Sequence, residues 1–206
     1  KQIHVSPVFD GHIHTVTLRD EFGELDFYLL PFVKPATVRS CFPEAKIEDY
    51  NDALKRVLAQ ALQGADPARR KLLLAHQFVT GAARSDSEET AVGGLDNVDA
   101  AVFQGFDYVA LGHIHKPQNI GNERLRYSGS PLKYSFSEAE QEKGISLVTL
   151  GEKRAGEAAE LSVTLLPLRP RRELRCLRGS YEELTARSFY EGLSKEDYYR
   201  ITLTDE

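Results

Sequence analysis

The chain has 206 residues, of which 41% are hydrophobic and 28% charged, and its net charge is −5 at pH 7. No apolar run reaches the ~18–20 residues of a membrane-spanning helix, and the acidic balance gives no general sign of a nucleic-acid binder, although a local basic surface can serve that purpose. The cysteines, Cys41 and Cys176, lie far apart and in no motif, which predicts reduced thiols and a cytoplasmic location.

The first part of the chain predicts antiparallel strands. Segments 3–9 and 12–18 both resemble strands, and they flank Asp10-Gly11. That dipeptide is typical of a hairpin turn, because glycine accepts a positive φ. The segment DEFGE (20–24) predicts a turn that leads into a third predicted strand, 25–33.

The middle of the chain alternates between helix and strand signals. Segment 46–64 carries apolar residues at a period of about 3.6, which predicts an amphipathic helix. The runs 71–78 and 107–115 each contain a continuous apolar stretch, which predicts strands buried on both faces. Between them lie a predicted loop, 80–94, and a short helix, 97–103. This order predicts a layered α/β core.

The last third predicts short strands and one short helix. These elements are the strands 124–129, 144–150 and 160–168 and the helix 181–186. We expect residues 1–160 to belong to one α/β domain and residues 161–206 to begin another. The chain starts at Lys1, contains no methionine and ends just after a strand-like segment, so we expect it to be a piece of a longer protein.

Three histidines follow the two predicted buried strands. His113 and His115 belong to the tetrapeptide Gly-His-Ile-His, and side chains at i and i+2 of an extended chain project to one face roughly 6–7 Å apart. His76 ends the other strand, so parallel strands in one sheet would bring all three imidazoles to one edge. Imidazole is a common metal ligand, which predicts a metal site. The alternative is a pair of surface imidazoles in a turn.

The same tetrapeptide occurs at 11–14, where we interpret it differently. No buried strand precedes this copy and no third ligand is evident. His12 and His14 are therefore predicted to be partly exposed residues of an ordinary hairpin strand, and His4 has the same interpretation.

Four stretches, in this order and at these spacings, resemble the SbcD branch of the calcineurin-like metallophosphoesterase superfamily. They are AHQF (75–78), VGGLDNVDA (92–100), FDYVALGHIHKPQ (106–118) and YSGSPLKYSFSE (127–138). The resemblance runs over nearly the whole chain. It implies part of a β-sandwich flanked by helices, with the C-terminal part of the catalytic domain in 1–160 and the beginning of a capping, DNA-binding domain in 161–206.

The resemblance also implies a site for two divalent metal ions, expected to be Mn²⁺. His76 and His113 would bind one ion and His115 the other. The bridging aspartate, the asparagine ligand and the catalytic histidine of the superfamily have no counterpart in this sequence. We therefore expect no catalytic residue beyond the metal ligands, weak metal binding and little or no activity from this chain alone.

The implied function is that of an Mn-dependent DNA exonuclease and endonuclease in DNA repair, recombination and replication. Its implied partners are an SbcC-like ATPase, DNA and a second nuclease protomer in a homodimer, without a membrane. One alternative is another metallophosphoesterase that hydrolyses nucleotides or small phosphodiesters. The other is a non-catalytic module that binds metal or DNA.

Two further stretches carry candidate contacts. Arg171, Arg172 and Arg175 belong to a basic cluster that could bind DNA phosphates, although a solvated strand face is the favoured interpretation. The segment RSDSEE (84–89) follows His76, and its carboxylates could reach a metal or a partner. The favoured interpretation of that segment is a solvated loop.

Overall fold

The computed structural model of the protein describes residues 3–88 and 97–205. Its centre is a mixed sheet of six strands in the order β1-β2-β3-β6-β8-β7. Strands β2, β3, β6 and β8 run parallel, while β1 and β7 pair antiparallel at the two ends. The strands are β1 (His14–Asp20), β2 (Gly23–Leu29), β3 (Arg70–His76), β6 (Tyr108–Gly112), β7 (Gln118–Ile120) and β8 (Asn122–Tyr127).

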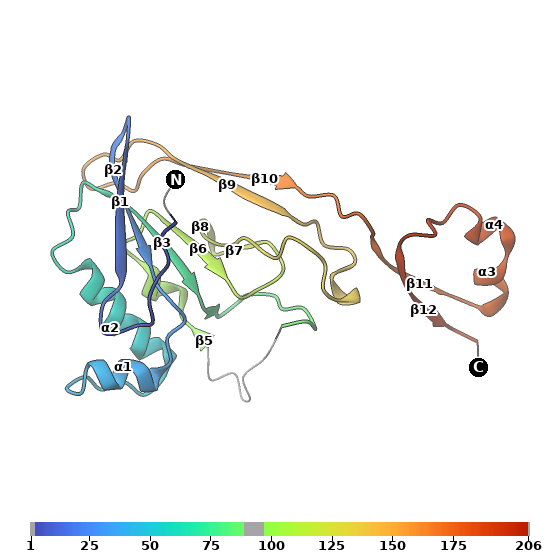
Figure 1. Ribbon diagram of the computed structural model, residues 1–206, viewed down its shortest axis with the longest axis horizontal. Coiled ribbons are helices and arrows are strands. Elements are labelled where there is room, and N and C mark those ends of the chain that lie inside the picture. Colours follow the sequence, from blue (N-terminus) through green and yellow to red (C-terminus); the bar gives the residue numbers. More distant parts are fainter. Residues whose placement is uncertain (1–2, 89–96, 206) are drawn as a thin grey trace.

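Two helices, α1 (Pro35–Cys41) and α2 (Tyr50–Leu62), lie beside the sheet at one end of the molecule (Figure 1). The helix α2 begins at Asp49, whose side chain accepts a hydrogen bond from the backbone N–H of Asp52 and so caps the first turn. Its apolar stripe is buried in the main core, together with alternate residues of the central strands. The short strands β4 (Phe78–Val79) and β5 (Asn97–Val98) and the 3₁₀ helix η2 (Ala100–Phe103) complete this side.

A β-hairpin covers the other face of the sheet. Its strands, β9 (Gly144–Leu150) and β10 (Leu161–Pro167), pair antiparallel along their full length. Tyr108, Leu150 and Ala159 form a second, smaller core between hairpin and sheet. The predicted layered α/β fold is thereby confirmed, with helices on one face and a β layer on the other.

The C-terminal unit, residues 174–203, lies at the far end of the long hairpin (Figure 1). Its two parallel strands, β11 (Leu174–Gly179) and β12 (Tyr198–Leu203), are connected through the short helices α3 (Tyr181–Thr185) and α4 (Arg187–Tyr190). The domain boundary predicted between residues 160 and 161 falls inside the β9–β10 hairpin, and the division into two domains stays a prediction.

The 3₁₀ helix η3 (Phe136–Glu138) connects the C-terminal unit to the larger part of the molecule. Cys176 Sγ donates to the Phe136 carbonyl at 3.5 Å, and the Arg200 guanidinium lies 5.7 Å from the centre of the Phe136 ring. An ion pair of 2.8 Å between Lys133 and Glu173 adds a further contact.

The prediction for the N-terminal strands was partly wrong. Residues 3–9 form no strand, and Asp10-Gly11 makes no hairpin turn. The turn predicted at 20–24 is confirmed: β1 and β2 turn between Asp20 and Gly23, where the Asp20 carboxylate accepts the Phe22 N–H at 2.8 Å and Gly23 adopts a φ of +98°. This combination of an aspartate acceptor and a left-handed glycine stabilises the turn.

The helix α1 was not predicted, because its seven residues are too few to show a helical period. The predicted strands at the chain's centre are confirmed as β3 and β6, and the later ones as β8, β9 and β10. Residues 89–94 of the predicted loop 80–94 and residues 92–96 of the stretch VGGLDNVDA lie outside the described residues. Within the described ranges, no helix combines the length and apolar character needed to cross a bilayer.

Candidate metal centre

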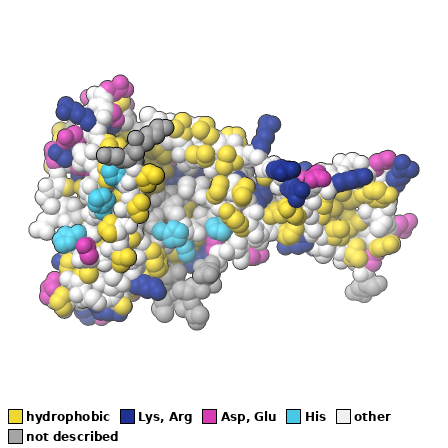
Figure 2. Space-filling model, viewed as in Figure 1, with side chains coloured by type: hydrophobic (Ala, Val, Ile, Leu, Met, Phe, Trp, Pro, Cys, Tyr) yellow, Lys and Arg dark blue, Asp and Glu magenta, His cyan; other side chains and the backbone are white. Residues whose placement is uncertain are grey.

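The three histidines can meet at one edge of the sheet only if β3 and β6 are adjacent and parallel, and the structure shows that they are. In their register His76, the last residue of β3, stands opposite Gly112, the last residue of β6. Side chains that follow such strand ends lie at the carboxyl edge of the sheet, where ligands bind in layered α/β proteins. Histidine side chains gather on one face of the larger part of the molecule (Figure 2).

His76 and His113 are direct neighbours. Their rings pack edge to face, with centroids 5.3 Å apart. Gly112 makes this approach possible, since a Cβ atom at that position would come within 2.8 Å of His76 Nδ1. Burial, and secondly the adjacent His113, lower the pKa of His76 below 6.5, which favours the neutral imidazole that binds metals.

His113 adopts a φ of +100° and is the only residue other than glycine with a positive φ in the described ranges. Such a conformation costs an imidazole-bearing residue of order 1–3 kcal/mol, and strain of this kind concentrates at functional sites. The turn lets Ile114 enter the core, where 2% of its surface is exposed, while His113 stays beside His76 and Phe78.

His115 lies separately from this pair and is held by the loop that follows β4. Its backbone N–H donates to the Glu88 carboxylate at 2.5 Å. Its ring nitrogen Nδ1 lies 2.9 Å from Ser87 Oγ and 3.2 Å from Glu138 Oε1. The Tyr134 ring packs against the imidazole with centroids 5.5 Å apart.

Glu138 is fully buried beneath His115. Lys143 Nζ donates to its Oε2 at 2.7 Å, and Ser87 Oγ donates to its Oε1. Burial acts to raise the pKa of Glu138, but the hydrogen bonds from Lys143, Ser87 and His115 outweigh it and lower that pKa to about 2. Glu138 is therefore a carboxylate, a permanent acceptor, at neutral pH.

The three imidazoles fit part of the donor set that the resemblance implies. A close pair, His76 and His113, stands beside a separate His115, as expected for ligands of two different ions. No group of three or more metal-ligating side chains lies close enough to hold an ion alone among residues 3–88 and 97–205. The nearest carboxylates, Glu88 and Glu138, are engaged in hydrogen bonds. Carboxylates suit Mn²⁺ better than imidazoles alone.

The tetrapeptide at 11–14 does not join this cluster. The His12 N–H donates to the Asp10 carboxylate, and β1 begins at His14. The N-terminal segment contributes differently, because His4 and His76 line the same open cavity of about 460 Å³. Sequence reasoning missed this proximity, since no local pattern links a residue of irregular chain to the end of β3.

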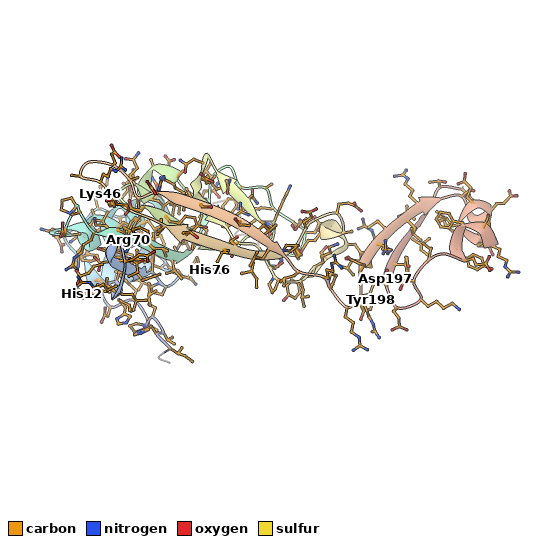
Figure 3. All side chains as sticks on the ribbon, turned by 90° about the horizontal axis from the view of Figure 1, so that it is seen from above. His12, Lys46, Arg70, His76, Asp197 and Tyr198 are labelled. Atoms are coloured by element: carbon orange, nitrogen blue, oxygen red, sulfur yellow. The ribbon has the colours of Figure 1, made fainter. Side chains whose placement is uncertain are left out.

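The candidate DNA-binding arginines lie in and next to the C-terminal unit. Figure 3 places Asp197 and Tyr198 there, well away from His76. Arg172 pairs with Glu196 at 3.1 Å and Arg175 with Asp197 at 2.7 Å, whereas Arg171 is exposed. The structure thus brings the histidines together and keeps the arginines apart from them.

No protein-family profile matches the chain. Over 186 residues, 90% of its length, the chain is 35% identical to the SbcD component of the nuclease SbcCD from Staphylococcus epidermidis and covers 48% of that protein. It is likewise 35% identical over 182 residues to the SbcD component from Staphylococcus saprophyticus, of which it covers 46%. The chain thus spans about half the length of these relatives. The similarity confirms the resemblance in the motifs: the chain is consistent with a fragment of the SbcD family of SbcCD components.

Proposed function

We propose that the chain contributes half of the metal centre of an SbcD-type DNA nuclease. The observation that carries the proposal is the position of His76 and His113 at the ends of adjacent parallel strands, with His115 two residues further on. In this proposal the intact protein is a cytoplasmic Mn²⁺-dependent exonuclease and endonuclease in DNA repair, recombination and replication. It works as a homodimer with an SbcC-like ATPase.

In the proposed site His76 and His113 hold one divalent ion and His115 holds the other. Bound divalent ions supply Lewis acidity toward a phosphodiester and activate water for attack on phosphorus. The protein's own part is to orient the imidazoles: the β3–β6 register sets His76 against His113, and hydrogen bonds at the loop after β4 fix His115. The remaining ligands and the catalytic histidine lie outside this chain.

The test is Mn²⁺-dependent cleavage of linear DNA by the intact protein, meaning the full-length protein that carries this chain. We expect His115→Ala to lower cleavage at least 100-fold, because the ion that His115 would hold could no longer stabilise the reacting phosphate. His12→Ala is the matched control, since His12 is exposed and outside the cluster. Full activity of the His115→Ala variant would refute the assignment.

The alternative of a non-catalytic binding module rests on one observation. No group of three or more metal-ligating side chains lies together among the described residues, and the carboxylates that contact His115, those of Glu88 and Glu138, are engaged in hydrogen bonds. If the intact protein binds DNA and Mn²⁺ yet cleaves neither linear DNA nor a small phosphodiester, the module is the better description. Cleavage of the small phosphodiester alone identifies another kind of metallophosphoesterase.

A further inference from the structure

A buried, charged cluster lies directly behind His115. Its members are Glu138, of which none of the surface is exposed, and Lys143, of which 5% is exposed. Lys143 Nζ donates to Glu138 Oε2 at 2.7 Å and to the His115 carbonyl oxygen at 2.8 Å. Replacing a buried ion pair by well-packed apolar residues is often neutral or stabilising, so burial of this pair is weak evidence for a contribution to stability.

The cluster specifies which nitrogen of His115 carries the proton. Glu138 Oε1 lies 3.2 Å from His115 Nδ1, and Ser87 Oγ lies 2.9 Å from the same nitrogen. Ser87 Oγ also donates a hydrogen bond to Glu138 Oε1. Because the Ser87 hydroxyl hydrogen is directed at the carboxylate, both oxygens near Nδ1 act as acceptors. Nδ1 must then be the donor, and in a neutral imidazole the other nitrogen, Nε2, keeps its lone pair.

We propose that Glu138, anchored by Lys143, is the positioning residue that holds His115 in the tautomer and orientation in which Nε2 faces a metal ion. Ser87 provides the second contact to Nδ1 of His115. The inference rests on the proposed function, because it assigns a partner to one of its ligands. A carboxylate that accepts the outer N–H of a ligating histidine fixes the ring and raises its basicity.

A matched control is available elsewhere in the chain. Asp107 is 2% exposed and pairs with Lys153 at 2.9 Å, and its carboxylate also accepts the backbone N–H groups of Lys71 and Ala159. It resembles Glu138 in burial, charge and Lys partner but has no histidine beside it. Asp107→Asn therefore measures the general effect of neutralising a buried acid.

The first experiment reads the tautomer of His115 directly. In the intact protein with ¹⁵N-labelled histidine and no added metal, we expect long-range ¹H–¹⁵N NMR spectra to show His115 protonated at Nδ1. The His115→Ala variant identifies the signal. In Glu138→Gln, Lys143 retains the amide oxygen, so the amide nitrogen faces His115 as a donor and the tautomer shifts to Nε2–H. Asp107→Asn leaves it at Nδ1.

The second experiment measures Mn²⁺ affinity by titration calorimetry. We expect Glu138→Gln to weaken binding by about 10–100-fold, the usual effect of losing such an outer partner, and Asp107→Asn to leave it unchanged. If Glu138→Gln does not fold, Ser87→Ala replaces it, because Ser87 is only partly buried and its loss removes one hydrogen bond. We expect a smaller loss of affinity in that variant.

The outcomes separate this inference from the proposed function. If His115→Ala weakens Mn²⁺ binding but neither Glu138→Gln nor Ser87→Ala does, the positioning role is refuted and the metal centre stands. An Nε2–H tautomer in the wild-type protein refutes the positioning role as well. If His115→Ala itself leaves Mn²⁺ binding unchanged, the assignment of His115 as a ligand fails, and both proposals fail with it.

Discussion

At the scale of single residues, one tetrapeptide adopts two backbone conformations. In Gly-His-Ile-His at 11–14 the positive φ, +107°, belongs to the glycine, whereas at 112–115 it belongs to His113, at +100°. The second copy follows a buried strand whose end must place Ile114 in the core. The surrounding fold, and not the local sequence, therefore determines where the strain lies.

This strain predicts an order of stability among variants of His113. Glycine tolerates a positive φ without steric cost, whereas alanine does not, so His113→Gly should be more stable than His113→Ala by about 1 kcal/mol. Urea denaturation of the intact protein measures the difference. At His12, whose φ is not positive, alanine should be the more stable replacement. Equal stabilities at position 113 would show that the strain is absent.

At the scale of elements, the site depends on how β3, β6 and β8 fit together. Tyr127, the last residue of β8, donates its hydroxyl to the Gln77 carbonyl and accepts the Val79 N–H, both at 2.8 Å. These bonds fix the chain immediately after His76, so three strands cooperate to hold one imidazole. Burial raises the pKa of Tyr127 and keeps the hydroxyl protonated as a donor.

The close contact between β6 and His76 predicts the effect of Gly112→Ala. The added Cβ would lie 2.8 Å from His76 Nδ1, so the imidazole must move away from His113. We expect Mn²⁺ affinity to fall at least 10-fold with little loss of secondary structure, as measured by calorimetry and circular dichroism. Gly192→Ala is the control, because nothing lies within 4 Å of its Cβ position and its φ is not positive. Unchanged affinity in Gly112→Ala would contradict the paired-ligand geometry.

The sequence was sufficient for the parts of the site that follow a strand pattern. The apolar runs predicted β3 and β6, and with them the edge shared by His76 and His113. It could not predict that Glu138 reaches His115, because the two are 23 residues apart and no periodicity relates them. The turn at 20–24 could be predicted because Asp20 and Gly23 are turn residues, whereas the turn predicted at Asp10-Gly11 is absent because residues 3–9 form no strand.

At the scale of the whole molecule, the basic segment lies away from the histidines, in and beside the C-terminal unit. Arg172 and Arg175 are partly neutralised by Glu196 and Asp197, whereas Arg171 is exposed on the connection from the β9–β10 hairpin. In the proposed nuclease, the C-terminal unit would contact phosphates of the DNA at a distance from the cleavage site. Such contacts add affinity without sequence preference.

Charge reversal at Arg171 tests whether this basic segment contacts DNA. Arg171→Glu in the intact protein should weaken DNA binding and lower the slope of log affinity against log salt by about one. Fluorescence anisotropy at several salt concentrations measures both quantities. Arg154→Glu is the control, because Arg154 is exposed in the loop between β9 and β10. DNA affinity at low salt that is identical in the two variants and the wild type would count against contact by Arg171.

The three-residue helix η3 has a mechanical consequence. At one end, Phe136 receives the Cys176 thiol and the Arg200 side chain of the C-terminal unit. At the other end, the Glu138 carboxylate forms a hydrogen bond with the imidazole of His115. A displacement of the C-terminal unit, caused by DNA or by a neighbouring protomer, would therefore be transmitted through a single helical turn to that imidazole. DNA binding by the C-terminal unit would then be coupled to the orientation of the metal ligand.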